Sequence, residues 1–150
     1  MSFEELIEHL SEELHIELIP DNQQTVSILI DDHLTVQIEV DDYKKEFLFI
    51  AFIAEVAPGR FREEVFKSAL VINDFPARIG TFSYYKEENY FTFHKFISTE
   101  TPKEEIVNFL TEIIYIAEKW KKALESGKSA PDDLPSKSKN SSLKPFGLKP

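Results

Sequence analysis

Hydrophobic periodicity divides the chain into helical and extended stretches. Near the beginning, Ser2 and Glu5 form a capping-box pattern, and the apolar residues that follow recur at helical spacing, which predicts a helix over residues 3–14. The same spacing predicts two further helices, over residues 61–72 and 102–124. The chain is therefore predicted to contain three helices.

Between the helices, apolar residues recur with the period of β-strands. Alternation predicts strands over residues 26–30 and 34–40, and two aromatic-rich strands over 80–85 and 90–97. The stretch 47–56 is apolar at both parities, which is typical of a central strand covered on both faces. The predicted order of elements is α-β-β-β-α-β-β-α.

This order favours an α+β fold. Short turns between consecutive strands indicate antiparallel pairing in a sheet of about five strands, with three helices segregated from it. We expect helices 3–14 and 102–124 to cover one sheet face. Helix 61–72 then needs another surface for its apolar stripe, and burial in a second copy of the chain, as a homodimer, is the simplest solution.

Periodicity stops at residue 125. We predict a folded domain over residues 1–124 and a disordered tail over 125–150, rich in Ser, Lys and Pro. Five Lys and three acidic residues give the tail a net charge of +2, so residues 1–124, with 12 basic and 24 acidic residues, carry −12 of the total of −10. Residues 144–149, Lys-Pro-Phe-Gly-Leu-Lys, are compatible with a short peptide ligand, although a disordered end is the simpler interpretation.

Composition excludes several classes of function. With 27 acidic and 17 basic residues, the chain repels phosphate backbones, so we expect no nucleic-acid partner despite the alternating aromatic residues of 90–96. The longest apolar run, 47–54, is too short for membrane insertion, which needs about twenty residues. The absence of a signal-peptide pattern and of cysteine predicts a cytoplasmic protein without disulfides.

No catalytic or metal-binding pattern emerges. The best candidate is a metal site built from Asp31, Asp32, His33, Asp41 and Asp42. One extended strand separates its two halves by about 30 Å, so we interpret these residues as turn formers. The four histidines are scattered, and neither a nucleophile elbow nor a phosphate loop is present, so we predict no catalytic residue, metal or cofactor.

One segment carries a resemblance to a known family. Residues 59–73 read Gly-Arg-Phe-Arg-Glu-Glu-Val-Phe-Lys-Ser-Ala-Leu-Val-Ile-Asn, followed by Pro76 and a strand that opens Gly80-Thr81-Phe82. Together with the order of elements, this segment makes residues 1–124 resemble the class I type III secretion chaperones, the CesT/SycE-like group. The resemblance implies a non-enzymatic, homodimeric bacterial virulence chaperone that keeps the amino-terminal segment of a secreted effector or gatekeeper protein extended and secretion-competent, without ATP.

The resemblance also implies two surfaces. The dimer contact would be formed by helix 61–72 and the strand after Gly80, with these expected residues: Phe61, Phe66, Leu70 and Phe82. The effector-binding groove would be lined by Leu6, Leu10, Val26, Ile28, Val36 and Ile38, for which a role in the monomer core is the alternative. Surface acids such as Glu39, Asp41 and Asp42 would steer a basic substrate segment.

Other functions stay open at this point. A heterodimer with a related co-chaperone is a variant of the chaperone interpretation. A dimeric protein-binding adaptor unrelated to secretion, and a small ligand carrier or enzyme, are the alternatives from other classes.

Overall fold

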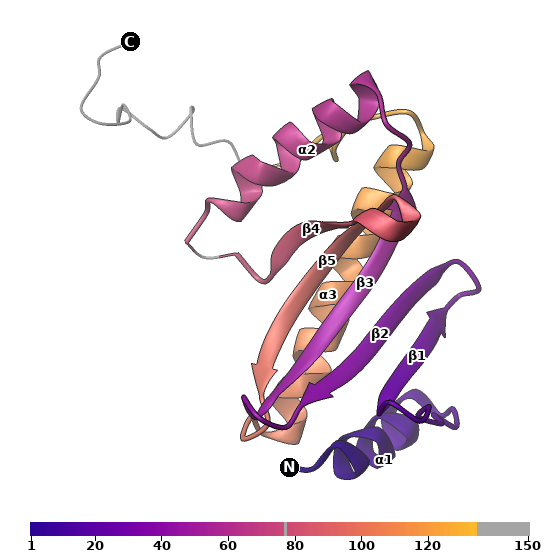
Figure 1. The fold of residues 1–150 in the computed structure, drawn as a ribbon, viewed down its shortest axis with the longest axis vertical. Helices are drawn as coiled ribbons and strands as arrows, with labels where there is room; N and C mark the ends of the chain where they lie inside the picture. Colours follow the sequence, from indigo (N-terminus) through magenta and orange to yellow (C-terminus); the bar gives the residue numbers. More distant parts are fainter. Residues whose placement is uncertain (77, 135–150) are drawn as a thin grey trace.

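The computed structural model describes residues 1–76 and 78–134. Its elements, in chain order, are α1 (Phe3–Leu14), β1 (Thr25–Ile30), β2 (Leu34–Asp41), β3 (Glu46–Glu55), α2 (Arg60–Asn73), β4 (Thr81–Tyr85), the short 3₁₀ turn η1 (Lys86–Glu88), β5 (Tyr90–Ser98) and α3 (Lys103–Glu125). The predicted order of three helices and five strands is confirmed (Figure 1). The predicted α1 matches the observed bounds, because the Ser2 capping box forms as expected.

The strands form one antiparallel sheet in the order β1-β2-β3-β5-β4. Hairpins join β1 to β2 and β2 to β3, while α2 leads from the middle of the sheet to its far edge strand, β4. The long helix α3 runs behind the sheet, and α1 lies beside the β1 end (Figure 1). α2 lies beyond β4 at the other end of the molecule, outside the layer formed by α1 and α3.

One face of the sheet is covered by α1 and α3. A row of paired residues on this face is formed by Val36, Ala51, Phe93 and Phe82, all of them buried. Phe3 of α1 contacts Phe47, and Trp120 of α3 lies 4.6 Å from the ring of Phe82. Burial of such side chains contributes about 1.5–3 kcal/mol each, so this face holds the hydrophobic core.

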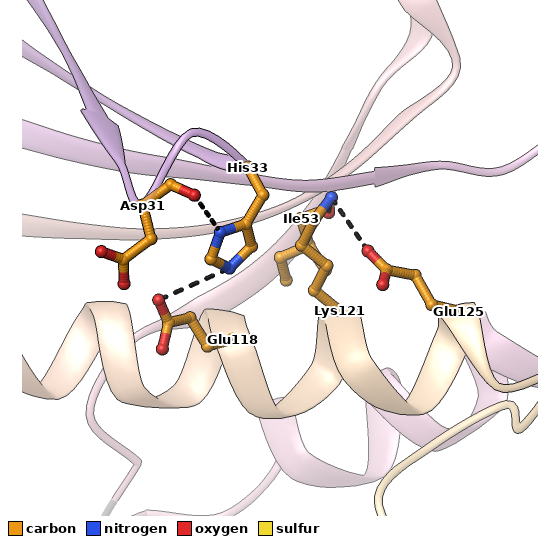
Figure 2. A network of polar contacts seen from close by, with 6 residues as sticks. All are labelled: Asp31, His33, Ile53, Glu118, Lys121 and Glu125. Carbon is orange, nitrogen blue, oxygen red and sulfur yellow. Dashed lines mark hydrogen bonds and ion pairs between the residues drawn. The ribbon is translucent and has the colours of Figure 1, made fainter.

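Polar contacts attach α3 to the strands. Figure 2 shows His33, in the β1–β2 turn, between the backbone oxygen of Asp31 (2.9 Å) and the carboxylate of Glu118 on α3 (3.7 Å). One turn further on, Lys121 donates to the backbone oxygen of Ile53 and pairs with Glu125 at 3.4 Å. Ile53 lies at a register shift in β3, and the lysine satisfies its carbonyl there. α3 is thus fixed to both β1–β2 and β3.

The second face of the sheet differs from our expectation. We predicted that residues 47–56 form a strand covered on both faces, and the described residues cover only one. Phe47 and Phe49 are buried under the helices, whereas Leu48, Ile50 and Phe52 on the opposite face are half-buried. In the described part of the chain, no helix lies over them (Figure 1). The apolar pattern reflects a face that residues 1–76 and 78–134 leave uncovered.

The folded part continues beyond the predicted boundary at residue 124. α3 ends at Glu125, and the following segment then returns to the core, where Ala130 and Leu134 pack against buried residues. The carboxylate of Asp133 pairs with Lys119 at 2.7 Å, and this hydrogen bond lowers the pKa of the aspartate. The remainder of the predicted tail, 135–150, lies outside the described residues. Nowhere in the ranges 1–76 and 78–134 is a helix both long and apolar enough to span a bilayer.

Candidate partner-binding surfaces

The uncovered face of the sheet forms a hollow of about 570 Å³. It runs across four strands because alternate residues of each strand point to the same side. The lining residues are Gln37, Glu39, Leu48, Ile50, Phe52, Ser83, Tyr84, Tyr85, Glu88, Thr92, His94 and Phe96. We call this surface the sheet hollow. Its size is that of a site for several side chains of a partner.

The sheet hollow is apolar along its centre and acidic at its margins. Leu48, Ile50 and Phe52 form the centre, and Phe96 is 53% exposed beside them. Glu39 and Glu88 are the acidic lining residues, and the described lining contains neither Lys nor Arg. A partner that offers apolar side chains flanked by positive charge therefore complements this surface.

A small polar cluster forms part of the hollow's floor. The hydroxyl of Ser83 lies 2.6 Å from that of Thr92 and 3.1 Å from Nδ1 of His94. Burial lowers the pKa of His94 from its ordinary value of 6.5, which favours the neutral imidazole. Among the described residues, no carboxylate is hydrogen-bonded to this imidazole. The cluster therefore lacks the acidic residue that orients the histidine of a nucleophilic triad.

α2 is joined to the sheet by contacts with β4. Arg62 donates to the hydroxyl of Tyr84 at 2.7 Å, and its guanidinium lies over the rings of Tyr84 and Phe66. At the other end of α2, the side-chain amide of Asn73 donates to the backbone oxygen of Phe82 and accepts from its N–H, at 2.9 and 2.8 Å. The Asn73 amide thus forms hydrogen bonds with the N–H and the oxygen of Phe82, two backbone groups that an additional strand would need at this edge.

The predicted dimer residues separate into two groups. Phe82 is buried, and Phe66 packs 5.2 Å from the ring of Tyr84, so both contribute to packing within the chain. Phe61 and Leu70 are exposed, Leu70 by 65%, and Val71 is exposed beside them. Phe66, Leu70 and Phe82 also line a second pocket, of about 220 Å³, between α2 and β4. This surface is mainly apolar and has no cover within the described residues.

The predicted groove residues lie in the core. Leu6, Leu10, Val26, Ile28, Val36 and Ile38 are each at most 2% exposed. The alternation in β1 and β2 correctly marks one apolar face, but this face is the one that α1 and α3 cover. In this structure none of the six side chains presents a surface to a partner, and the exposed apolar residues of the sheet lie on its opposite face.

β1 supplies a free edge. It lies at the end of the sheet and pairs with β2. Within the ranges described, Asp21 occupies the first position of β1, where its N–H donates to the oxygen of Thr25 and its carboxylate accepts from the Thr25 N–H, and no further strand pairs with the rest of this edge. Leu29, 58% exposed, is in register with Thr35 and Phe52 and so extends the uncovered face toward this edge. The β1 edge and the sheet hollow are thus continuous.

The acidic residues of the candidate metal site lie in two turns, where turn geometry explains their presence. Asp31 and Asp32 have positive φ angles in the β1–β2 turn, and Asp41 accepts from the N–H of Lys44 in the next turn. Among residues 1–76 and 78–134, no group of three or more His, Asp or Glu side chains is placed to hold a metal ion.

Solved structures share this fold. The chain in the crystal structure of the ExsC–ExsE complex aligns with a TM-score of 0.62 at 15% identity, over 79% of this chain and 90% of that one. The structure of the HopA1–SchA chaperone–effector complex gives 0.65 at 14% identity, over 81% and 94%. The Yersinia pestis type III secretion chaperone SycH in complex with a fragment of YscM2 gives 0.58 at 14% identity, over 77% and 97%.

Sequence comparison gives the family. No curated protein sequence matches the chain. The sequence model of the Tir chaperone protein (CesT) family matches residues 5–121, from the first turn of α1 to the last turns of α3. This range contains the sheet hollow, the β1 edge and the α2–β4 surface. The chain belongs to the Tir chaperone protein (CesT) family.

Proposed function

We propose that this protein is a bacterial type III secretion chaperone that binds the amino-terminal segment of a secreted effector or gatekeeper protein and keeps it extended. The observation that carries the proposal is the sheet itself, which has one face packed under helices and an apolar face that the described residues do not cover. Membership of the CesT family and the fold shared with chains from chaperone–effector complexes support it. Holding an extended chain is a binding function, and we propose no catalytic role or cofactor.

The two edges of the sheet favour β1 as the docking strand. An extended segment gains affinity by adding main-chain hydrogen bonds to a sheet edge. The β4 edge is occupied at Phe82 by the Asn73 amide, whereas the β1 edge is unpaired over most of its length in the described structure. A substrate strand on β1 would place alternate side chains beside Leu29 and continue into the sheet hollow.

Charge supports an interaction with a neutral or basic segment. The chain carries a formal charge of −10, and Glu39 and Glu88 lie at the margin of the hollow. Charge complementarity of this kind raises association rates and is screened by salt over about 10 Å at 0.1 M. Together with the family assignment, this surface supports action in the bacterial cytoplasm, where unsecreted substrate is present.

We propose a homodimer formed through α2 and β4. Phe61, Leu70 and Val71 are exposed on α2, next to the apolar pocket against β4. A self-complementary pair of such surfaces would bury them in a symmetric interface. A heterodimer with a related co-chaperone would use the same surface.

The proposed dimer is tested by replacing the apolar side chain of Leu70 with a charged one. Leu70→Glu places a charge in the centre of the proposed interface, so we expect light scattering to show a monomer in place of a species of twice 17.4 kDa. Lys103→Glu, at an exposed position at the beginning of α3 and outside the proposed interface, is the control and leaves the dimer intact. A Leu70→Glu protein that stays dimeric would remove α2 from the interface, and a monomeric wild type would favour the heterodimer.

Substrate binding is tested by capture from the host. The full chain is used to retain proteins from a lysate, and the retained partner is identified by mass spectrometry and shortened stepwise. We expect stoichiometric capture of a secreted protein through roughly its first hundred residues, as the resemblance implies, and weaker capture by Leu29→Asp on the β1 edge. Capture of cytosolic proteins only, through folded domains, would favour the adaptor alternative.

A further inference from the structure

We propose that residues 144–149 of this chain, Lys-Pro-Phe-Gly-Leu-Lys, occupy the chain's own sheet hollow and compete there with a substrate segment. The hollow is an uncovered apolar surface whose charged lining residues are acidic. The segment that follows the last described residue, Leu134, has the opposite character. It contains four Lys and no acidic residue between positions 135 and 150.

The side-chain pattern of the segment fits an apolar surface. Phe146 and Leu148 are two residues apart, so in an extended chain they point to the same side. That spacing would place Phe146 and Leu148 against Leu48, Ile50 and Phe52, and Lys144, on the same side of an extended chain, would lie toward an acidic margin of the hollow.

Proline favours the face of the sheet over its edge. Pro145 has no N–H and cannot complete a ladder of main-chain hydrogen bonds, so the segment is a poor additional strand for β1. Side-chain burial in the hollow does not need that ladder. The segment and a substrate strand would thus share the hollow but not the β1 edge.

The connecting chain is long enough. Leu134 packs against the core, which fixes the starting point on the folded domain. Phe146 is twelve residue steps beyond Leu134, a distance of up to about 40 Å when the chain is extended. A domain of about 124 residues has a radius of gyration of about 14 Å, so the segment reaches either face of the sheet.

Because the segment is covalently attached to the domain, even weak binding is sufficient for it to occupy the hollow. A connection of this length holds its ligand at an effective concentration of the order of 1 mM. A segment that binds with a dissociation constant near 0.1 mM would then be bound about nine-tenths of the time and would weaken a competing ligand about tenfold. The hollow would be covered until a better ligand arrives.

Photo-crosslinking tests the location. A benzoyl-phenylalanine at position 146 of the full chain should crosslink to β3 or β5 at the hollow, and the same group at position 138 should not. Mixing light and isotope-labelled chains separates the sources, because crosslinks within one chain support the proposal. Crosslinks between chains, or to the α2–β4 pocket, would overturn it.

Peptide competition tests the occupancy. A synthetic peptide that copies residues 141–150 is titrated onto the full chain and onto the full-length Phe146→Ser/Leu148→Ser double variant, with Ser138→Ala as the control. We expect the double variant to bind the peptide about tenfold more tightly, and Ile50→Ser in that background to weaken binding again. Equal affinities, or no binding at millimolar peptide, would overturn the proposal.

The competitive role rests on the proposed chaperone function, but neither experiment uses a secreted partner. Loss of the self-docking proposal would leave the chaperone function standing, and failure to capture a secreted protein would leave the crosslinking result intact.

Discussion

The two faces of the sheet use the same strands for different purposes. In β3, Phe47 and Phe49 pack under α1 and α3, while Leu48 and Ile50 alternate with them and look into the uncovered hollow. Both sets are equally apolar in sequence. An apolar pattern in a strand therefore indicates that a face is suited to burial. The pattern does not indicate whether that face is buried by the same chain or by a partner.

The largest expected effect is a loss of stability that differs between the two faces of the sheet. Phe49→Ala removes a fully buried ring from the covered face, so we expect a loss of about 3–5 kcal/mol in the free energy of unfolding, measured by urea denaturation. Ile50→Ala, its neighbour on the open face, should cost clearly less in the isolated chain, because Ile50 is only half-buried there. Similar losses for both would mean that Ile50 is packed as completely as Phe49 in the free protein, and the difference between the two faces would then be wrong.

The next effect compares the two edges of the sheet. Asn73→Ala removes two hydrogen bonds to the backbone of Phe82, so we expect a loss of about 1–3 kcal/mol in unfolding free energy and faster amide exchange in β4. Lys67→Ala, exposed on the same helix, is the control. Unchanged exchange in β4 would show that the amide does not hold this edge, and the preference for β1 as docking strand would lose its basis.

The smallest effect concerns the floor of the hollow. Burial lowers the pKa of His94 below 6.5, so the unfolded chain binds a proton more readily than the folded one. The resulting stability is present above pH 6.5 and is lost as the pH falls from there through the pKa of the folded state. We expect urea denaturation at about pH 7.5 and about pH 5 to show a smaller decrease for His94→Gln than for wild type. His33→Gln, at an exposed turn, is the control, and an equal decrease in all three proteins would contradict the assignment.

Most of the fold was predictable because local signals and packing agree. The capping box at Ser2 and the helical spacing after it give α1, and period-two alternation gives β1 and β2. The predicted order and the sharing of one face by α1 and α3 are confirmed. The end of the folded part was less predictable, because Ala130 and Leu134 pack singly, without a periodic pattern around them.

The candidate surfaces were harder to predict. Periodicity identifies apolar positions in β1 and β2 but cannot tell which face the helices cover, and the expected groove residue Val36 therefore lies in the core. The signal for the hollow was present in the apolar residues of both parities in 47–56, including Phe52, which we interpreted as coverage on both faces. His94 and Phe96 join this surface only through strand pairing, which the sequence does not display.

The most direct test of the central claim is amide hydrogen exchange, read by mass spectrometry, of the full chain alone and in complex with the captured partner's amino-terminal segment. We expect new protection in β1 and in the strands beneath the sheet hollow, little change in α3, and a bound segment that lacks a globular fold of its own. Protection confined to the outer surface of α3, or a bound partner that keeps a folded domain, would contradict it.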